Sequence, residues 1–122
     1  VRIDFALMEH VLINLLLNSS QHSPPGSDLK LAASHENGNL VIRVSDSGPG
    51  FPEKSLPHLF DKFFRVEGSP AGGLGLGLSI VKGIVDVHKG TVTAENIETG
   101  GAMFTVAIPS GLPDMNHLDL AK

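Results

Sequence analysis

The sequence predicts an α+β fold, a two-layer α/β sandwich in which helices pack on one face of a mixed, mostly antiparallel sheet. Three observations support this class: a long apolar helical pattern opens the chain, a second one follows a glycine-rich stretch, and two pairs of short alternating segments are each joined by a turn. Helices gathered on one face of an antiparallel sheet bury all of these apolar faces economically.

Length and composition indicate one domain, which we place at residues 1–109, followed by a loose polar tail at 110–122. The 122 residues are 41% hydrophobic, contain no cysteine and carry a net charge of −4. This balance argues against nucleic acid as the main partner, and the lack of cysteine excludes disulfides and thiolate metal sites. No apolar run reaches membrane-spanning length. The opening Val1–Asp4 segment is typical of a strand end, so we expect a truncated N-terminal strand and a longer parent protein.

The first helix is predicted over residues 5–21, with Asp4 as its N-cap. Its apolar residues cover a very wide arc, which predicts a mostly buried helix. Asn14 and Asn18 lie four residues apart on the remaining arc and share one face. They either bond to neighbouring backbone or line a cleft and hold a metal or ligand. The apolar arc consists of Phe5, Met8, Leu12, Ile13, Leu15, Leu16 and Leu17.

Two strands at 29–34 and 40–45 are joined by Asn37-Gly38, a strong hairpin signal. The second strand alternates, and if it continues, Asp46 lies on its apolar face. A carboxylate on a core face is costly unless something binds it. Asp46 therefore either starts a turn or points into a pocket.

A loop and short helix follow at 52–60, and residues 60–65 hold three of the six phenylalanines. We expect these rings to form a small satellite core under a loop. Lys62 and Arg65 in the same run are the candidates for reaching a ligand.

Four glycines among leucines at 72–77 precede the second helix, whose apolar half includes Leu78, Ile80, Val81, Ile84, Val85, Val87 and His88. Backbone freed by glycine at a helix N-terminus suits a phosphate, although a flexible loop capping a buried helix is an equal alternative. The spacing is neither a P-loop nor the dinucleotide-binding pattern. Gly90 is the expected helix stop and His88 a packing residue. Strands at 91–96 and 102–108 flank a turn at 98–101 and complete the pattern.

Five motifs stand in order: Asn14-x-x-x-Asn18, Asp46-x-Gly48-x-Gly50, the run from Phe60 to Arg65, Gly73-x-Gly75-x-Gly77 and Gly100-Gly101-Ala102-x-Phe104. They resemble the N, G1, F, G2 and G3 boxes of sensor histidine kinases. The resemblance covers residues 1 to 109 and implies the Bergerat-type ATP-binding fold of the gyrase, Hsp90, histidine kinase and MutL ATPases. The patches at 86–90 and 94–102 also resemble the potassium-responsive KdpD sensor kinases.

The resemblance implies that ATP and Mg²⁺ bind. Asn18 would bind Mg²⁺ with help from Asn14, and Lys62 and Arg65 would approach the transferred phosphate. Asp46 would accept a hydrogen bond from the adenine amino group. Residues 66–76 would form an ATP lid. The implied nucleotide-binding set is Asp46, Gly48, Gly50, His22, Gly73, Gly75, Gly77, Leu76, Leu78 and Phe104.

The family's phosphoacceptor is a histidine on a separate dimerisation domain of the same protein, and the phosphate then passes to a response regulator. The acceptor motif is absent here, because His10 is preceded rather than followed by Glu9. We expect a monomeric, cytoplasmic domain of a homodimeric protein, without nucleic-acid or membrane contact of its own.

Three departures from the family pattern concern nucleotide affinity: Gln21 replaces a lysine, His22 an aromatic residue and Met103 a serine or threonine. Asn14 stands where hydrolysing members of the superfamily carry a glutamate base. An amide cannot take a proton from water, so we expect feeble ATP hydrolysis. The alternatives are a serine kinase of the anti-sigma-factor type, a degenerate nucleotide-binding or docking module, and an ATPase of the gyrase or MutL kind.

Overall fold

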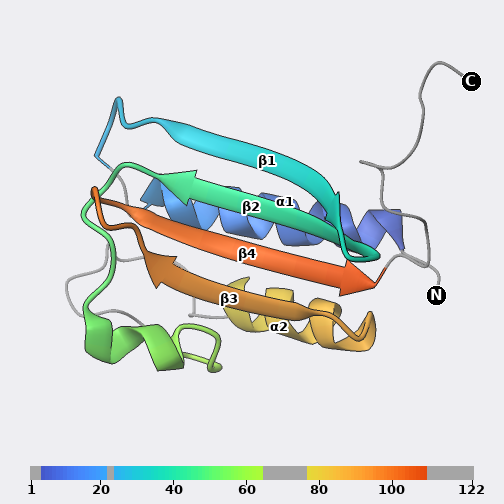
Figure 1. The fold of residues 1–122 in the computed structure, drawn as a ribbon. Helices are drawn as coiled ribbons and strands as arrows, with labels where there is room; N and C mark the ends of the chain where they lie inside the picture. The colour runs from blue at the N-terminus through green and yellow to red at the C-terminus, as the bar shows by residue number, and fades with distance from the viewer. Residues whose placement is uncertain (1–3, 22–23, 65–76, 110–122) are drawn as a thin grey trace, which may run out of the picture.

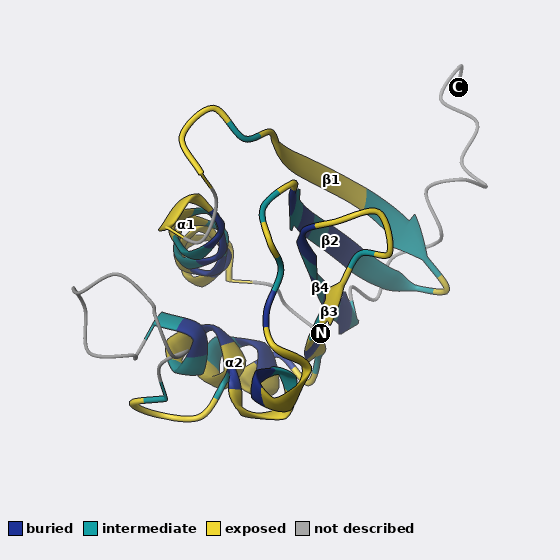
Figure 2. Cartoon of the chain, turned by 90° about the vertical axis from the view of Figure 1, so that its left-hand side faces the viewer, coloured by how far each residue is buried: buried dark blue, intermediate teal, exposed yellow. Residues whose placement is uncertain are grey.

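A computed structural model describes residues 4–21, 24–64 and 77–109, and two layers are evident in it (Figure 1). Four strands form one sheet in the order β1-β2-β4-β3, and every pairing is antiparallel. Helices α1 and α2 cover one face of this sheet (Figures 1 and 2). The predicted α+β sandwich is confirmed, although no parallel strand pair occurs among the described residues. The elements are α1 Phe5–Gln21, β1 Leu29–Glu36, β2 Asn39–Asp46, the 3-10 helix η1 Glu53–His58, α2 Gly77–Val87, β3 Thr91–Asn96 and β4 Ala102–Pro109.

The hairpin between β1 and β2 forms where the sequence predicts it. Asn37 and Gly38 both have positive φ, 55° and 79°, as the tight turn favoured by twisted strands requires. Glu36 pairs with Asn39 beside the turn, and Leu29 pairs with Asp46 at the far end. This register fixes the face on which every β2 side chain lies, including that of Asp46.

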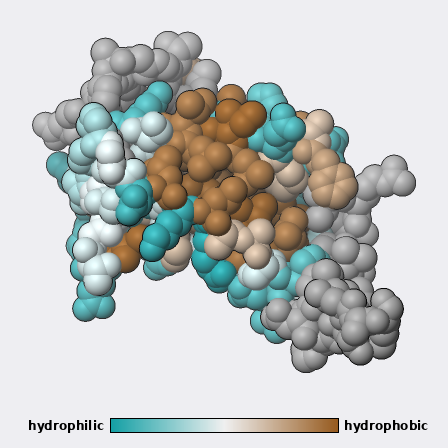
Figure 3. All heavy atoms as spheres, turned by 90° about the horizontal axis from the view of Figure 1, so that it is seen from above, coloured by the Kyte–Doolittle hydropathy of each residue, from teal (hydrophilic) through white to brown (hydrophobic). Residues whose placement is uncertain are grey.

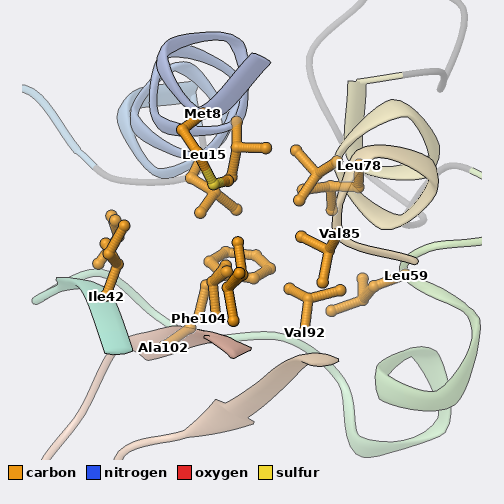
Figure 4. Packing of buried hydrophobic residues seen from close by; sticks show 14 of the residues in the cluster. Met8, Leu15, Ile42, Leu59, Leu78, Val85, Val92, Ala102 and Phe104 are labelled. Atoms are coloured by element: carbon orange, nitrogen blue, oxygen red, sulfur yellow. The ribbon is translucent and has the colours of Figure 1, made fainter. Parts of the chain in front are cut away.

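One hydrophobic core lies between the helices and the sheet (Figure 4). Met8 and Leu15 of α1 and Leu78 of α2 point toward Phe104 on β4 (Figure 4). The predicted inward face of β4 is confirmed, because its alternate residues from Ala102 to Ile108 are all buried. The strand thus anchors both helices over the sheet.

Helix α1 has the predicted bounds, but the expectation that it is mostly buried is wrong. Its fully buried face is the stripe Met8, Val11, Leu15 and Ser19, and Phe5 is 79% exposed. Ile13 and Leu17 are also exposed, as are Leu29 and Leu31 of β1, and the molecule shows a broad apolar surface when seen from above (Figure 3). The sheet and α2 cover a narrower arc of the helix than its apolar residues span.

Helix α2 also buries only part of its apolar half. Leu78, Val81 and Val85 are buried, whereas Ile80 is exposed and Val87 is 76% exposed. Apolar residues on a helix are therefore not all core residues, and here only one stripe faces the sheet.

The end of α2 does not use Gly90 as its left-handed stop. Lys89 takes that conformation with φ 59°, its N–H bonds to Asp86 O, and the Gly90 N–H bonds back to Val85 O. These two bonds make a Schellman cap. Glycine is needed at position 90 for a different reason, since a Cβ there would collide with the Ala107 carbonyl of β4.

His88 has the predicted packing role. Its ring is buried, Nε2 accepts a hydrogen bond from the Asp4 N–H at 3.1 Å, and Nδ1 donates to Ile84 O at 2.8 Å. Asp4 caps α1 as predicted, because its Oδ1 accepts the Leu7 N–H. The start of α1 and the end of α2 are thereby joined.

The phenylalanines after η1 do not form a separate satellite core. Phe60 packs edge-on against Phe104 at 6.1 Å between ring centroids, and both Phe60 and Phe64 lie against the main core. Phe63 is 64% exposed and has φ 64°, an uncommon conformation for an aromatic residue.

Candidate functional site

Most of the predicted site residues that the structure describes lie toward one end of the domain. At this end α1, β2 and β3 finish while α2 and β4 begin (Figures 1 and 2). The loop after β2, the turn between β3 and β4 and the C-terminal turns of α1 therefore meet there. Segments far apart in the sequence supply its polar groups.

Asp46 is the buried acid of this end, with only 7% of its surface exposed. It lies on the core face of β2, as strand parity predicts. Its Oδ1 accepts the Gly48 N–H at 2.9 Å and, more weakly, the Ala102 N–H at 3.4 Å. No described residue donates a hydrogen bond to Oδ2, so this oxygen remains an acceptor for another molecule.

Glycine is required where the loop after β2 crosses the turn between β3 and β4. Gly101 has φ 92°, and a Cβ on it would collide with the Asp46 carbonyl oxygen. Gly50 has φ 76°, and a Cβ on it would lie 2.7 Å from Asn96 Oδ1. The Gly-rich motifs around Asp46 and before Phe104 thus fit against each other, so that the Ala102 N–H reaches the carboxylate.

The two asparagines of α1 are half-buried on one side of the helix, but their surroundings differ. Asn14 Nδ2 donates to His10 O at 2.9 Å, which is the backbone bond that the sequence left open. Its Oδ1 lies near Gly77, since a Cβ on Gly77 would be 3.2 Å from it. Asn18 Oδ1 is buried without a hydrogen-bond partner among the described residues.

An orphaned amide oxygen at this position fits a cation or a donor from a ligand, because a buried acceptor without a partner is costly. The described part of the chain contains no group of three or more His, Cys, Asp or Glu side chains that could hold a metal. Oxygen ligands such as this amide oxygen suit a hard cation.

Two further predicted residues lie in the core rather than at its rim. Leu78 is buried in the first turn of α2, directly after Gly77. Phe104 has no exposed surface and packs under Phe51 and Phe60. Direct contact of Phe104 with a ligand stays a prediction, and it would need the side chains above the ring to move.

Lys62 is exposed in the turn after η1, and no hydrogen bond or ion pair joins it to the other described site residues. Several predicted residues lie outside the described residues, as do the predicted lid at 66–76 and the tail at 110–122. These residues are His22, Arg65, Gly73, Gly75 and Leu76.

Sequence reasoning missed two residues of this end. Ser19 is fully buried on α1, and its Oγ has no hydrogen-bond partner among the described residues. Asn96, the last residue of β3, bonds through its side chain to both backbone groups of Phe51. A serine on an apolar helical stripe could have signalled the first, whereas nothing local to residue 96 predicts the second.

Comparison with known proteins gives the family to which this fold belongs. The family of histidine kinase-, DNA gyrase B- and HSP90-like ATPases matches residues 3–112. The chain belongs to this ATPase family. Two curated relatives are sensor kinases: AfsQ2 of Streptomyces coelicolor is 41% identical over 88% of this chain, and KdpD of Escherichia coli is 44% identical over 89%. The predicted resemblance to histidine kinases, KdpD included, is confirmed.

Solved structures show the same fold in histidine kinases. The mycobacterial kinase MprB matches with a TM-score of 0.81 and 27% identity, over 89% of this chain and 76% of the other. The catalytic domain of ThkA, in a nucleotide-free form, matches with a TM-score of 0.77 and 32% identity over 90% and 70%. This ATPase domain spans only 20% of AfsQ2 and 12% of KdpD. None of its described helices is both long and apolar enough to cross a bilayer.

Proposed function

We propose that the chain is the ATP-binding catalytic domain of a two-component sensor histidine kinase. It transfers the γ-phosphoryl group of ATP to a histidine on a separate dimerisation domain, from which a response regulator receives it. The P–O bond to ADP breaks, a P–N bond to the imidazole forms, and ADP leaves. The observation that carries this proposal is buried Asp46, whose Oδ1 accepts two backbone N–H groups while no described residue donates a hydrogen bond to Oδ2.

Adenine can supply the hydrogen-bond donor that Asp46 Oδ2 lacks among the described residues. Its exocyclic amino group is a donor, and a bond from it to a buried carboxylate oxygen is charge-assisted and therefore strong. The resemblance assigns Gly48 and Gly50 to the adenine pocket: Gly48 adds no side chain to the loop after β2, and Gly50 leaves room for Asn96 behind the loop. We therefore propose that the base end of ATP lies beside Asp46.

The phosphate end would then lie beside α1 and the start of α2. Asn18 and Asn14 would hold Mg²⁺ through their amide oxygens together with phosphate oxygens. The ion would neutralise charge that develops during phosphoryl transfer, a reaction that depends on positioning and electrostatics. The orphaned Asn18 Oδ1 supports this assignment. Lys62 and Arg65, the lid residues Gly73, Gly75 and Leu76, and His22 keep their proposed contacts with the nucleotide.

Neither a phosphorelay nor rapid hydrolysis is expected from this domain alone. The acceptor histidine belongs to another domain, and Asn14 cannot serve as a base toward water. We propose that the full protein is a dimer that uses cytoplasmic ATP. The histidine kinase names of the relatives favour this reading over a serine kinase of the anti-sigma-factor type.

Calorimetry with ADP and inosine diphosphate tests the proposal. In Asp46→Asn, the amide oxygen can keep the Gly48 and Ala102 bonds, so the NH₂ group replaces Oδ2 and presents a donor. We expect ADP affinity to fall on the order of tenfold to a hundredfold, as for loss of a charged hydrogen bond. Inosine diphosphate carries a carbonyl at the same ring position, so its affinity should fall less or rise.

The matched control is Asp86→Asn, which removes an exposed carboxylate on α2 that pairs with Lys82. Both nucleotides should bind this variant as they bind the wild type. Absence of any ADP binding by the wild-type domain at millimolar concentration would contradict the proposal and favour the degenerate docking module. If Asp46→Asn lowered the affinity for both nucleotides equally, the base would not bind to Asp46.

A further inference from the structure

Asn96 closes the base end of the site by an unusual pairing. Its Oδ1 accepts the Phe51 N–H at 2.8 Å, and its Nδ2 donates to Phe51 O at 2.7 Å. A side-chain amide has the same donor and acceptor as a peptide group. Asn96 therefore binds Phe51 as a neighbouring strand would, although the two residues are 45 positions apart.

The pairing bridges strands that are not neighbours. Since β4 lies between β2 and β3, the loop leaving β2 must pass over the start of β4 to reach β3. Gly101 leaves room for the crossing, because a side chain there would collide with the Asp46 carbonyl. Gly50 leaves room for the amide of Asn96, which would lie 2.7 Å from a Cβ at position 50.

The loop is consequently fixed at both ends. At its start, Asp46 Oδ1 holds the Gly48 N–H. At its end, the buried ring of Phe51 stands edge-on to Phe104 at 6.0 Å, and Asn96 holds its backbone. The backbone between these anchors is the part of the loop that faces the base in the proposed function.

We infer that Asn96 is a positioning residue for nucleotide binding: it preorganises residues 48–51 beside Asp46 and so sets the affinity for the adenine part of ATP. The inference rests on the proposed function and assigns Asn96 no contact with the nucleotide. Binding to a loop that is already ordered avoids the entropic cost of ordering it, and affinity depends on that saving.

Competition against a fluorescent ATP analogue, with ADP·Mg²⁺ and with adenosine, measures this role in Asn96→Ala. We expect both ligands to bind about tenfold more weakly, because two hydrogen bonds that hold the loop are lost. If the affinity falls by the same factor for both ligands, the effect lies at the base end of the site, since adenosine has no phosphate. Thr93→Ala is the matched control, an exposed residue of the same strand, and should leave both affinities unchanged.

Asn96→Asp separates positioning from mere space filling. Aspartate has the same size and keeps an acceptor for the Phe51 N–H, but at neutral pH it cannot donate to Phe51 O. If Asn96 only fills space, this variant binds adenosine, which carries no charge, like the wild type. If the two-point pairing positions the loop, Asn96→Asp binds about as weakly as Asn96→Ala. Asn96→Asp also tests the inference if the alanine variant does not fold.

Measurement at 10 °C, well below the melting temperature of each variant, keeps a change in global stability from changing the apparent affinity. Wild-type affinity in both Asn96 variants, with a wild-type domain that binds ADP, would overturn the inference and leave the proposed function standing. A wild-type domain that binds no ADP would overturn both.

Discussion

The base end and the phosphate end of the proposed site are built differently. At the base end, Asp46 Oδ1 and the side chain of Asn96 each hold the loop after β2 through hydrogen bonds. At the phosphate end, Asn18 Oδ1 is buried with no partner among the described residues. The loop at the base end is thus held by bonds within the protein, with Asp46 Oδ2 left to accept a bond from a ligand, whereas the open acceptor at the phosphate end is a buried amide oxygen.

This difference separates stability from binding. Substitutions at the base end disturb contacts that the folded domain already makes, so they should lower both its stability and its affinity. Removing an orphaned acceptor at the phosphate end removes a cost from the folded domain, so it should lower affinity alone. The predictions below test this separation.

The largest effect on stability is expected for Gly101→Ala. The new Cβ would meet the Asp46 carbonyl, and the residue would keep a positive φ of 92°. Steric overlap and backbone strain together should cost about 3 kcal/mol or more of the free energy of unfolding. Urea denaturation measures this. Gly100→Ala is the control, because its φ is also positive but open space surrounds its Cβ, so it should lose only about 1 kcal/mol.

Gly90→Ala tests whether a similar collision away from the site spares binding. Its Cβ would meet the Ala107 carbonyl at the end of α2 that lies opposite the site, so we expect a loss of about 2 kcal/mol. The ADP dissociation constant, measured calorimetrically at low temperature, should not change. Gly83→Ala in the middle of α2 has free space and should instead stabilise the domain by about 0.5–1 kcal/mol. A weakened ADP affinity in Gly90→Ala would show that stability and binding are not separate at this end of α2.

At the phosphate end, Asn18→Ala should give the opposite pattern. The free energy of unfolding of the ligand-free domain should change by less than about 1 kcal/mol, because Asn18 Oδ1 accepts no hydrogen bond from the described residues. The affinity for ADP should fall about tenfold in Mg²⁺ and little in its absence, as titration in magnesium and in EDTA would show. A large loss of ligand-free stability would mean that Asn18 is a structural residue.

How far the sequence predicts this site depends on the range of the interactions. Strand alternation places Asp46 on the core face correctly, because a period of two leaves no other face once the strand is known. The helices and turns also follow from local patterns, because helical periodicity and turn-forming residues are visible among sequence neighbours. The proposed ligand contacts at positions 14 and 18 rest on resemblance and stay predictions.

Interactions between distant segments are not predictable in this way. The pairing of Asn96 with Phe51 requires the strand order β2-β4-β3, which no local pattern contains. Ile13 and Leu17 are exposed because the sheet covers only part of α1. Apolar character alone therefore overestimates how deeply these two side chains are buried. Gly90 was correctly placed at a helix end, but the reason for it lies on β4.

The smallest effect is expected on the sheet face opposite the helices, where neither end of the site is involved. Hydrogen bonds from Arg43, and then from Ser34, lower the pKa of Glu36 to about 2. A lowered carboxyl pKa stabilises the fold above its unfolded value near 4.5 and loses that effect as the pH falls toward 2. The stability difference between wild type and Glu36→Gln should therefore exist at pH 7 and shrink across that interval.

Because the pair is exposed, salt should reduce the same difference, and the ADP dissociation constant should be identical in the two proteins. Thermal unfolding between pH 7 and pH 2, at low and high salt, measures the stability difference. Calorimetry at pH 7 measures the ADP dissociation constant. A weaker ADP affinity in Glu36→Gln would show that the open sheet face influences the base end through β2, and the site would then extend beyond the residues that Asn96 holds together.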